Sequence, residues 1–175
     1  SGASISADKL YSLLKGEGNN HLRTEADDDL SSGYLEDKAY PGKLNTFYDI
    51  FRNNGTKKNT QAIFSTIGQT LSISDLHKFQ RLFDLTEENI TQNIGGFVQS
   101  SPCSDVDDCL EANLDMQYIM AVAHNMSNTF YYWDGSIDPW LSWLYEVADM
   151  TDPPSIFSIS FASYDAAFGN NYIRN

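Results

Sequence analysis

Apolar residues along this chain follow two spacings, one typical of helices and one typical of strands. Apolar positions three or four residues apart predict helices at 6–14 and 72–83. Strong helix formers predict a third helix at 110–123, and a fourth is expected at 139–148. Concentrations of β-branched and aromatic residues predict strands in four other segments: 59–69, 95–98, 128–133 and 156–161. Strands and helices therefore alternate for most of the chain, which favours an α/β fold with a mainly parallel sheet.

A polar and acidic segment interrupts this alternation between about residues 18 and 45. It has no sustained apolar period, so we expect a surface insertion. At the other end, residues 166–175 begin a segment without a clear stop signal, and a parallel sheet of so few strands would leave an apolar edge uncovered. We therefore expect these 175 residues to be the first part of a larger domain.

Composition and charge exclude several classes of protein. With 41% hydrophobic and 13% aromatic residues in 175, the chain has enough apolar material for one domain with a core. A net charge of −13, with 11 Lys and Arg that form no cluster, disfavours a nucleic-acid partner. No apolar run approaches the roughly 20 residues that span a bilayer. An acidic surface of this kind is compatible with work at low pH.

The two cysteines and three glycosylation sequons bear on the compartment. Cys103 and Cys109 flank a short polar stretch in which a local disulfide can close, although two free thiols remain the alternative. Sequons begin at Asn54, Asn89 and Asn125, all in polar or turn-like sequence. A disulfide and N-linked sugars would both indicate secretion or an acidic lysosome-like or vacuolar lumen.

The strongest candidate chemistry is a pair of carboxylates in the predicted helix 110–123. Glu111 and Asp115 are four residues apart, so both side chains project from one face, one turn apart. Because two like charges this close resist ionising together, one of them can keep its proton beside an ionised neighbour in acid. The competing interpretation is structural, with Glu111 in the first helical turn for dipole reasons and Asp115 on a solvated face.

The sequence around this pair resembles one family. The run from Glu111 to Asp115, with the Met-Gln-Tyr-Ile-Met that follows, is similar to the Glu-x-x-x-Asp helix of the sedolisins, the serine-carboxyl peptidases, and especially to their tripeptidyl-peptidase branch. Further stretches resemble the family in the same order: 10–11, 59–62, 74–83, 125–127, 139–144 and 158–161. The resemblance spans nearly the whole chain except the acidic insertion.

The resemblance implies a fold and a role for each site residue. It implies the amino-terminal half of a subtilisin-like three-layer α/β fold, and an acid-acting peptidase in which Glu111 is the general base and Asp115 orients it. By the same resemblance Ser160, Phe161 and Ala162 line the substrate, with an extended peptide paired along the strand end. Phe161 stands where Trp or Tyr is usual and Ala162 where Gly is usual, and both differences affect the specificity pocket.

The family's serine nucleophile, its oxyanion aspartate and its calcium-binding segment have no counterpart in these 175 residues. We therefore expect this chain to be inactive alone and completed by a second chain or segment. No metal site is expected within it, because the three histidines lack metal-ligand spacing with the cysteines and the 105–116 stretch does not match an EF-hand. Two alternatives remain, a non-catalytic peptide-binding fragment or degenerate homologue, and an unrelated acidic α/β domain.

Overall fold

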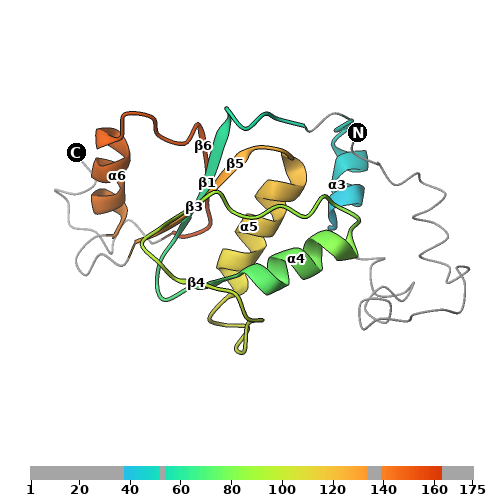
Figure 1. The fold of residues 1–175 in the computed structure, drawn as a ribbon, viewed down its shortest axis with the longest axis horizontal. Helices are drawn as coiled ribbons and strands as arrows, with labels where there is room; N and C mark the ends of the chain where they lie inside the picture. The colour runs from blue at the N-terminus through green and yellow to red at the C-terminus, as the bar shows by residue number, and fades with distance from the viewer. Residues whose placement is uncertain (1–37, 52–53, 134–138, 163–175) are drawn as a thin grey trace, which may run out of the picture.

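The computed structural model describes residues 38–51, 54–133 and 139–162. Four helices and six strands lie within these ranges, and Figure 1 labels them. The helices are α3 Pro41–Phe47, α4 Ile73–Leu82, α5 Leu110–Val122 and α6 Pro139–Asp149. The strands are β1 Thr60–Ser65, β2 Leu71–Ser72, β3 Gln92–Ile94, β4 Val98–Gln99, β5 Ser127–Tyr132 and β6 Ile156–Ile159.

The centre of the fold is a parallel four-stranded sheet in the order β3-β5-β1-β6. Ala62 in β1 is level with Thr129 in β5 and with Phe157 in β6, and every pairing in this sheet is parallel. In Figure 1, α3, α4 and α5 lie on one side of the strands and α6 lies on the other. The α/β class with a mainly parallel sheet is thereby confirmed, and the three layers are compatible with part of a subtilisin-like fold.

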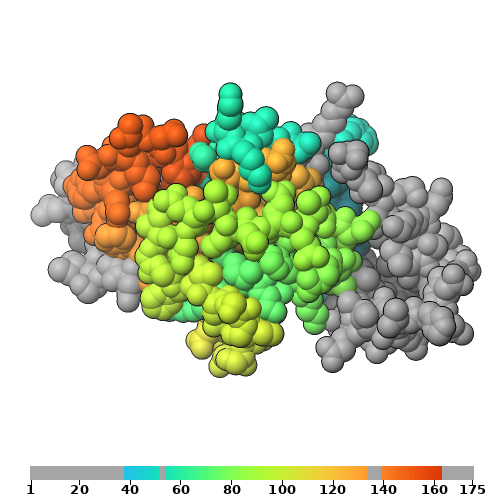
Figure 2. Space-filling model, in the orientation of Figure 1, coloured from blue at the N-terminus to red at the C-terminus, as the bar shows by residue number. Residues whose placement is uncertain are grey.

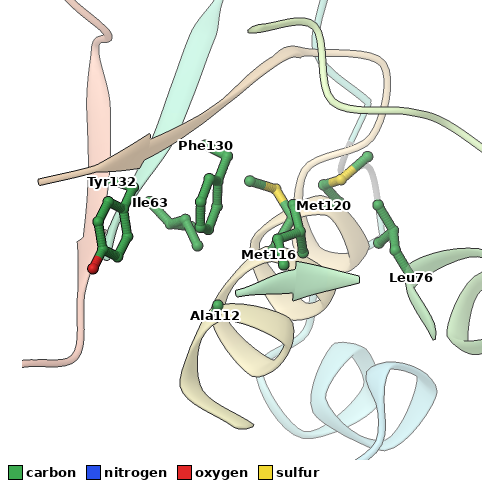
Figure 3. Packing of buried hydrophobic residues seen from close by; sticks show 8 residues of the cluster. Ile63, Leu76, Ala112, Met116, Met120, Phe130 and Tyr132 are labelled. Carbon is green, nitrogen blue, oxygen red and sulfur yellow. The ribbon is translucent and has the colours of Figure 1, made fainter. Parts of the chain in front are cut away.

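Two apolar clusters, one on each face of the sheet, hold these layers together. Because successive side chains of a strand point to opposite faces, Ile63 packs with Met116 and Met120 of α5, as Figure 3 shows. Its neighbour Phe64 packs on the other face with Trp143 of α6. Both faces are covered, so β1 is buried along nearly its whole length, as expected for a central parallel strand.

Buried polar side chains fix the direction of α5 relative to the sheet. Gln61, at the start of β1, donates from Nε2 to Asn128 Oδ1 at 2.7 Å and to the backbone oxygens of Ile119 and Ala123 at 3.3 and 3.2 Å. These bonds offset the cost of burying two amides and place the end of α5 at the amino ends of the strands. The start of α5, which bears Glu111, therefore lies at the opposite edge.

The structure confirms three of the predicted helices, at 72–83, 110–123 and 139–148. It also confirms three predicted strands, with narrower bounds, at 59–69, 128–133 and 156–161. Ser72 caps α4 by accepting from the Asp75 N–H at 3.1 Å. His77 lies outside the buried face of α4 and contacts Asn89. The helix predicted at 6–14 lies outside the described residues.

One local expectation was wrong. The segment 95–98 is no continuous strand, because Gly95 and Gly96 adopt positive φ angles of 85° and 84° and separate β3 from β4. Residues 41–47, which overlap the end of the expected surface insertion, form the helix α3 with Pro in its first turn. Helix α5 begins after Cys109, and this N-cap residue makes no side-chain cap hydrogen bond.

Gly95→Ala is expected to destabilise the fold strongly. An added Cβ at position 95 would lie 2.0 Å from the backbone oxygen of Tyr132, and the φ angle of 85° is in any case strained for alanine. We expect a loss of more than about 3 kcal/mol in the free energy of unfolding, measured by denaturant titration. Gly96→Ala is the control with the same kind of φ angle and open space around the new methyl, so its loss should be clearly smaller. Equal losses would show that the contact with β5 is unimportant.

Candidate active site

The candidate site lies at the carboxyl edge of the sheet. Helix α4, which follows β1, packs on one face with α5, whereas α6, which follows β5, packs on the other. In open α/β sheets, connections that leave adjacent strands toward opposite faces open a crevice at the carboxyl ends of those strands. The first turns of α5 and the end of β6 meet at this edge.

Asp115 is the buried member of the carboxylate pair. It is only 8% exposed, and its Oδ1 accepts a hydrogen bond from the Ser160 hydroxyl at 2.6 Å. Within the part of the chain that the structure describes, Oδ2 is buried and has no hydrogen-bond partner. Burial raises the pKa of Asp115, the Ser160 hydroxyl lowers it and the nearby Glu111 carboxylate raises it, with a net shift upward. The interpretation of Asp115 as a solvated residue is therefore wrong.

Glu111 lies one helical turn before Asp115 and is only half-buried. Its carboxylate is close enough to raise the pKa of Asp115. Its backbone N–H donates to Oε1 of Gln69 at 2.9 Å, so a side chain from the loop after β1 holds the start of the helix. The pair thus combines a buried carboxyl that favours its proton with a more exposed carboxyl beside it, as acid–base work requires.

The end of β6 lies directly against this pair. Ser160 comes straight after the strand, and its hydroxyl contacts Asp115. Phe161 is half-buried, with its ring 6.0 Å from that of Phe64 in an edge-to-face arrangement. Ala162 is exposed. The sequence predicts that all three line the substrate, and that role remains a prediction. The contact between Ser160 and Asp115 was not anticipated.

Comparison with known proteins gives the relationship. The chain is 27% identical to tripeptidyl-peptidase 1 of Bos taurus over 126 residues, which are 69% of this chain and 22% of that protein. It is 30% identical to tripeptidyl-peptidase 1 of Dictyostelium discoideum over 118 residues, 65% of this chain and 18% of that protein. The human protein of the same name gives 27% over 126 residues, again 69% and 22%.

These matches support a sedolisin-like relationship. The relationship expected from the motif around Glu111 and Asp115 is thereby confirmed. The chain spans about a fifth of the length of the curated relatives that it matches. No protein-family model matches it.

The loop before α5 carries a disulfide. Cys103 and Cys109 are bonded, with their Cα atoms 6.3 Å apart, and the loop between β4 and α5 projects from the body of the molecule in Figure 2. Cys109 is buried and directly precedes α5, so the bridge constrains the segment that leads to Glu111. Hydrogen bonds reinforce it, since the Cys103 N–H donates to Asp75 Oδ2 at 2.8 Å.

The other sequence expectations concern sugars, metals and membranes. Asn54, Asn89 and Asn125 are all exposed, and their modification remains a prediction. Among the described residues no group of three or more His, Cys, Asp or Glu side chains is placed to hold a metal ion. The helices in these residues include none that is long and apolar enough to cross a membrane.

Ser160→Ala is expected to raise the pKa of Asp115 further. The hydroxyl of Ser160 stabilises the ionised carboxylate, so its removal leaves burial and the Glu111 charge without that opposing contribution. A carbon-13 titration of the Asp115 carboxyl group measures the change. Ser155→Ala removes an exposed hydroxyl just before β6 and should leave the titration as in the wild type. An unchanged pKa in Ser160→Ala would show that the hydrogen bond does not persist in solution.

Proposed function

We propose that this chain is part of an acid-acting serine-carboxyl peptidase that hydrolyses peptide bonds. In this proposal Glu111 is the general base, Asp115 orients it, and the strand end formed by Ser160, Phe161 and Ala162 lines the substrate. The observation that carries the proposal is the 2.6 Å hydrogen bond between Ser160 and Asp115, because it brings the proposed peptide-binding strand end and the carboxylate pair to one edge of the sheet. The relationship to tripeptidyl-peptidase 1 supports the same class of reaction.

The chemistry follows from the unequal environments of the two carboxyl groups. The raised pKa of Asp115 favours its protonated form in acid. In this proposal the protonated carboxyl, whose Oδ2 makes no other hydrogen bond within the described residues, donates to the Glu111 carboxylate. Held in this way, Glu111 takes the proton of a serine hydroxyl as that oxygen attacks the peptide carbonyl carbon. Ionisation of Asp115 at higher pH removes its donor, so activity should fall toward neutral pH.

The serine nucleophile and the oxyanion aspartate belong, in this proposal, to a second chain or segment. Within the described residues β6 pairs only with β1, and Ile156 and Ile159 of β6 are 51% and 42% exposed. Parallel sheets are usually covered on both faces and continued at such edges, so this edge suits further strands. The interface is expected to be large and apolar. The calcium implied by the resemblance would lie in that segment, and no step above passes through it.

An acidic compartment fits this chemistry. We place the protein outside the cell or in an acidic lysosome-like or vacuolar lumen. The disulfide between Cys103 and Cys109 and the three exposed sequons support this placement, because both features are typical of proteins that pass through an oxidising secretory route.

The test is hydrolysis of peptides by the full-length protein between about pH 3 and pH 8. We expect cleavage with an acidic optimum and covalent labelling of one serine by a peptidyl phosphonate, with mass spectrometry placing that serine outside these 175 residues. Intact mass measured under native and denaturing conditions shows whether the serine lies in the same chain or in an associated one. Peptide binding without cleavage at any pH would overturn the proposal in favour of a non-catalytic peptide-binding protein.

A further inference from the structure

Gln69 lies in the loop after β1, and its side-chain amide reaches the start of α5. Oε1 accepts from the backbone N–H of Glu111 at 2.9 Å and from that of Ala112 at 3.4 Å, while Nε2 donates to the backbone oxygen of Asp107. The first N–H groups of a helix have no partner within the helix and normally receive a side chain from the N-cap residue. Here the N-cap is Cys109, which provides no side-chain bond, so Gln69 takes over that function from 42 residues away.

The backbone around Gln69 is itself tightly held. The Gln69 N–H donates to the Thr66 oxygen at 3.2 Å, the Gly68 N–H donates to the Tyr132 hydroxyl at 2.9 Å, and the Thr70 N–H donates to the Asp108 oxygen at 2.8 Å. The loop is therefore tied to the end of β5 and to the segment before α5 at once. Displacing Gln69 would require breaking bonds on both sides.

The same loop contains backbone strain. Ile67 has a φ angle of 57° although it is β-branched, and its side chain is 78% exposed, so no burial of that side chain repays the unfavourable geometry. Strained backbone of this kind persists where the surroundings fix it, and it is concentrated near functional sites. The neighbouring Gly68, at φ 77°, completes the left-handed turn that directs the chain to Gln69.

We propose that Gln69 is a positioning residue for Glu111. By holding the first turn of α5 through the Glu111 and Ala112 amides, it sets where the Glu111 carboxylate lies relative to Asp115 and to the end of β6. This inference rests on the proposed peptidase function only for its kinetic consequence, because the geometry of the two carboxyl groups can be measured without catalysis.

The experiment compares Gln69→Ala with Asn113→Ala in the full-length protein. Asn113 is the matched control, because its Oδ1 accepts from the Ser72 N–H at 2.9 Å and so ties α5 to β2, but it does not hold the Glu111 amide. The Tm should fall by a similar amount in both variants. Gln69→Ala alone should lower kcat on the order of tenfold with KM unchanged, since small displacements of a catalytic group have large kinetic effects.

Titration of the carboxyl groups by carbon-13 NMR provides the second readout. In Gln69→Ala the pKa of Asp115 should fall below that of the wild type, because Glu111 no longer lies close enough to raise it. Gln69→Glu keeps the acceptor for the Glu111 and Ala112 amides but loses the donor to the Asp107 oxygen. It should therefore restore part of kcat and of the coupled titration, and its charge should move the pH optimum on the order of half a unit upward.

Equal losses of kcat in Gln69→Ala and Asn113→Ala, with the Asp115 titration unchanged, would show that Gln69 only stabilises the fold. If the wild type proves inactive on peptides at every pH, the proposed function fails, and the titration alone decides. A lower pKa of Asp115 in Gln69→Ala then supports the positioning role, and an unchanged pKa overturns it.

Discussion

Glu111→Gln in the full-length protein is expected to lower kcat on peptides at acid pH by about a thousandfold, within the range that general-base catalysis provides. The amide is nearly the same size as the carboxylate but cannot accept the proton of the nucleophile. The fold should tolerate the change, because Glu111 is half-buried and its bond to Gln69 is made by the backbone N–H, which glutamine retains. Steady-state kinetics at the acid optimum, with Tm measured alongside, tests both statements.

Asp107→Asn is the matched control for this experiment. Asp107 lies in the same helix-leading segment, four residues before Glu111, and its side chain is exposed. Asp107→Asn replaces a carboxylate with an amide, as Glu111→Gln does, but it should leave kcat and KM close to the wild-type values. If Glu111→Gln keeps more than about a tenth of the wild-type kcat, the general base lies elsewhere and the proposed roles of the pair are wrong.

Helix-forming composition was enough to predict the helix that carries the site. The bounds 110–123 predicted for this helix compare with Leu110–Val122 in the structure, and the four-residue spacing of Glu111 and Asp115 follows directly from helical geometry. The strands β1, β5 and β6 could also be predicted, because the segments around them are rich in β-branched and aromatic residues. These features depend on neighbours in the chain.

The burial of Asp115 and its contact with Ser160 could not be predicted in this way. The two residues are 45 positions apart, and their approach depends on the parallel register of β6 against β1 and on the packing of α5 over both strands. Helix α5 also contacts α3 and α4, so much of its circumference is covered and no amphipathic pattern marks the buried side. The position of a carboxylate on such a helix therefore does not reveal whether water reaches it.

Gln69 escaped sequence reasoning for a related reason. A glutamine between a strand and a helix has no local pattern that connects it with a residue 42 positions later. The one available clue is at the start of α5, where Cys109 is the N-cap and makes no side-chain cap hydrogen bond. A helix start without a local cap indicates that a partner must come from elsewhere in the fold.

The buried carboxyl group also links stability to pH. The pKa of Asp115 is raised in the folded protein, so the folded state binds this proton more tightly than the unfolded chain does. The contribution to stability is fully present below the ordinary value of 3.8 and is lost as the pH rises through the higher folded-state pKa. At this position, the fold is therefore better suited to acid than to neutral conditions.

Asp115→Asn should consequently change stability and activity in opposite directions. The neutral amide can still accept the Ser160 hydroxyl, and it avoids burying a charge, so Tm near pH 7 should exceed that of the wild type. Below pH 3.8 the difference should nearly vanish, because the wild-type carboxyl is then protonated too. The kcat at the acid optimum should fall on the order of tenfold, because an amide N–H is a weaker hydrogen-bond donor to Glu111 than the O–H of a protonated carboxyl.

The pH profiles separate this explanation from a simple packing effect. If ionisation of Asp115 causes the loss of activity toward neutral pH, the residual activity of Asp115→Asn should no longer fall as the pH rises. The activity of Asp107→Asn should still fall in that range. Scanning calorimetry between about pH 3 and pH 7 measures the stability difference in the same variants. A Tm gain that is equally large at both ends of this range would mean that the raised pKa is not its cause. A gain confined to neutral pH, together with the loss of that pH dependence, would indicate that the buried carboxyl at position 115 supports catalysis in acid and costs the fold stability where it ionises.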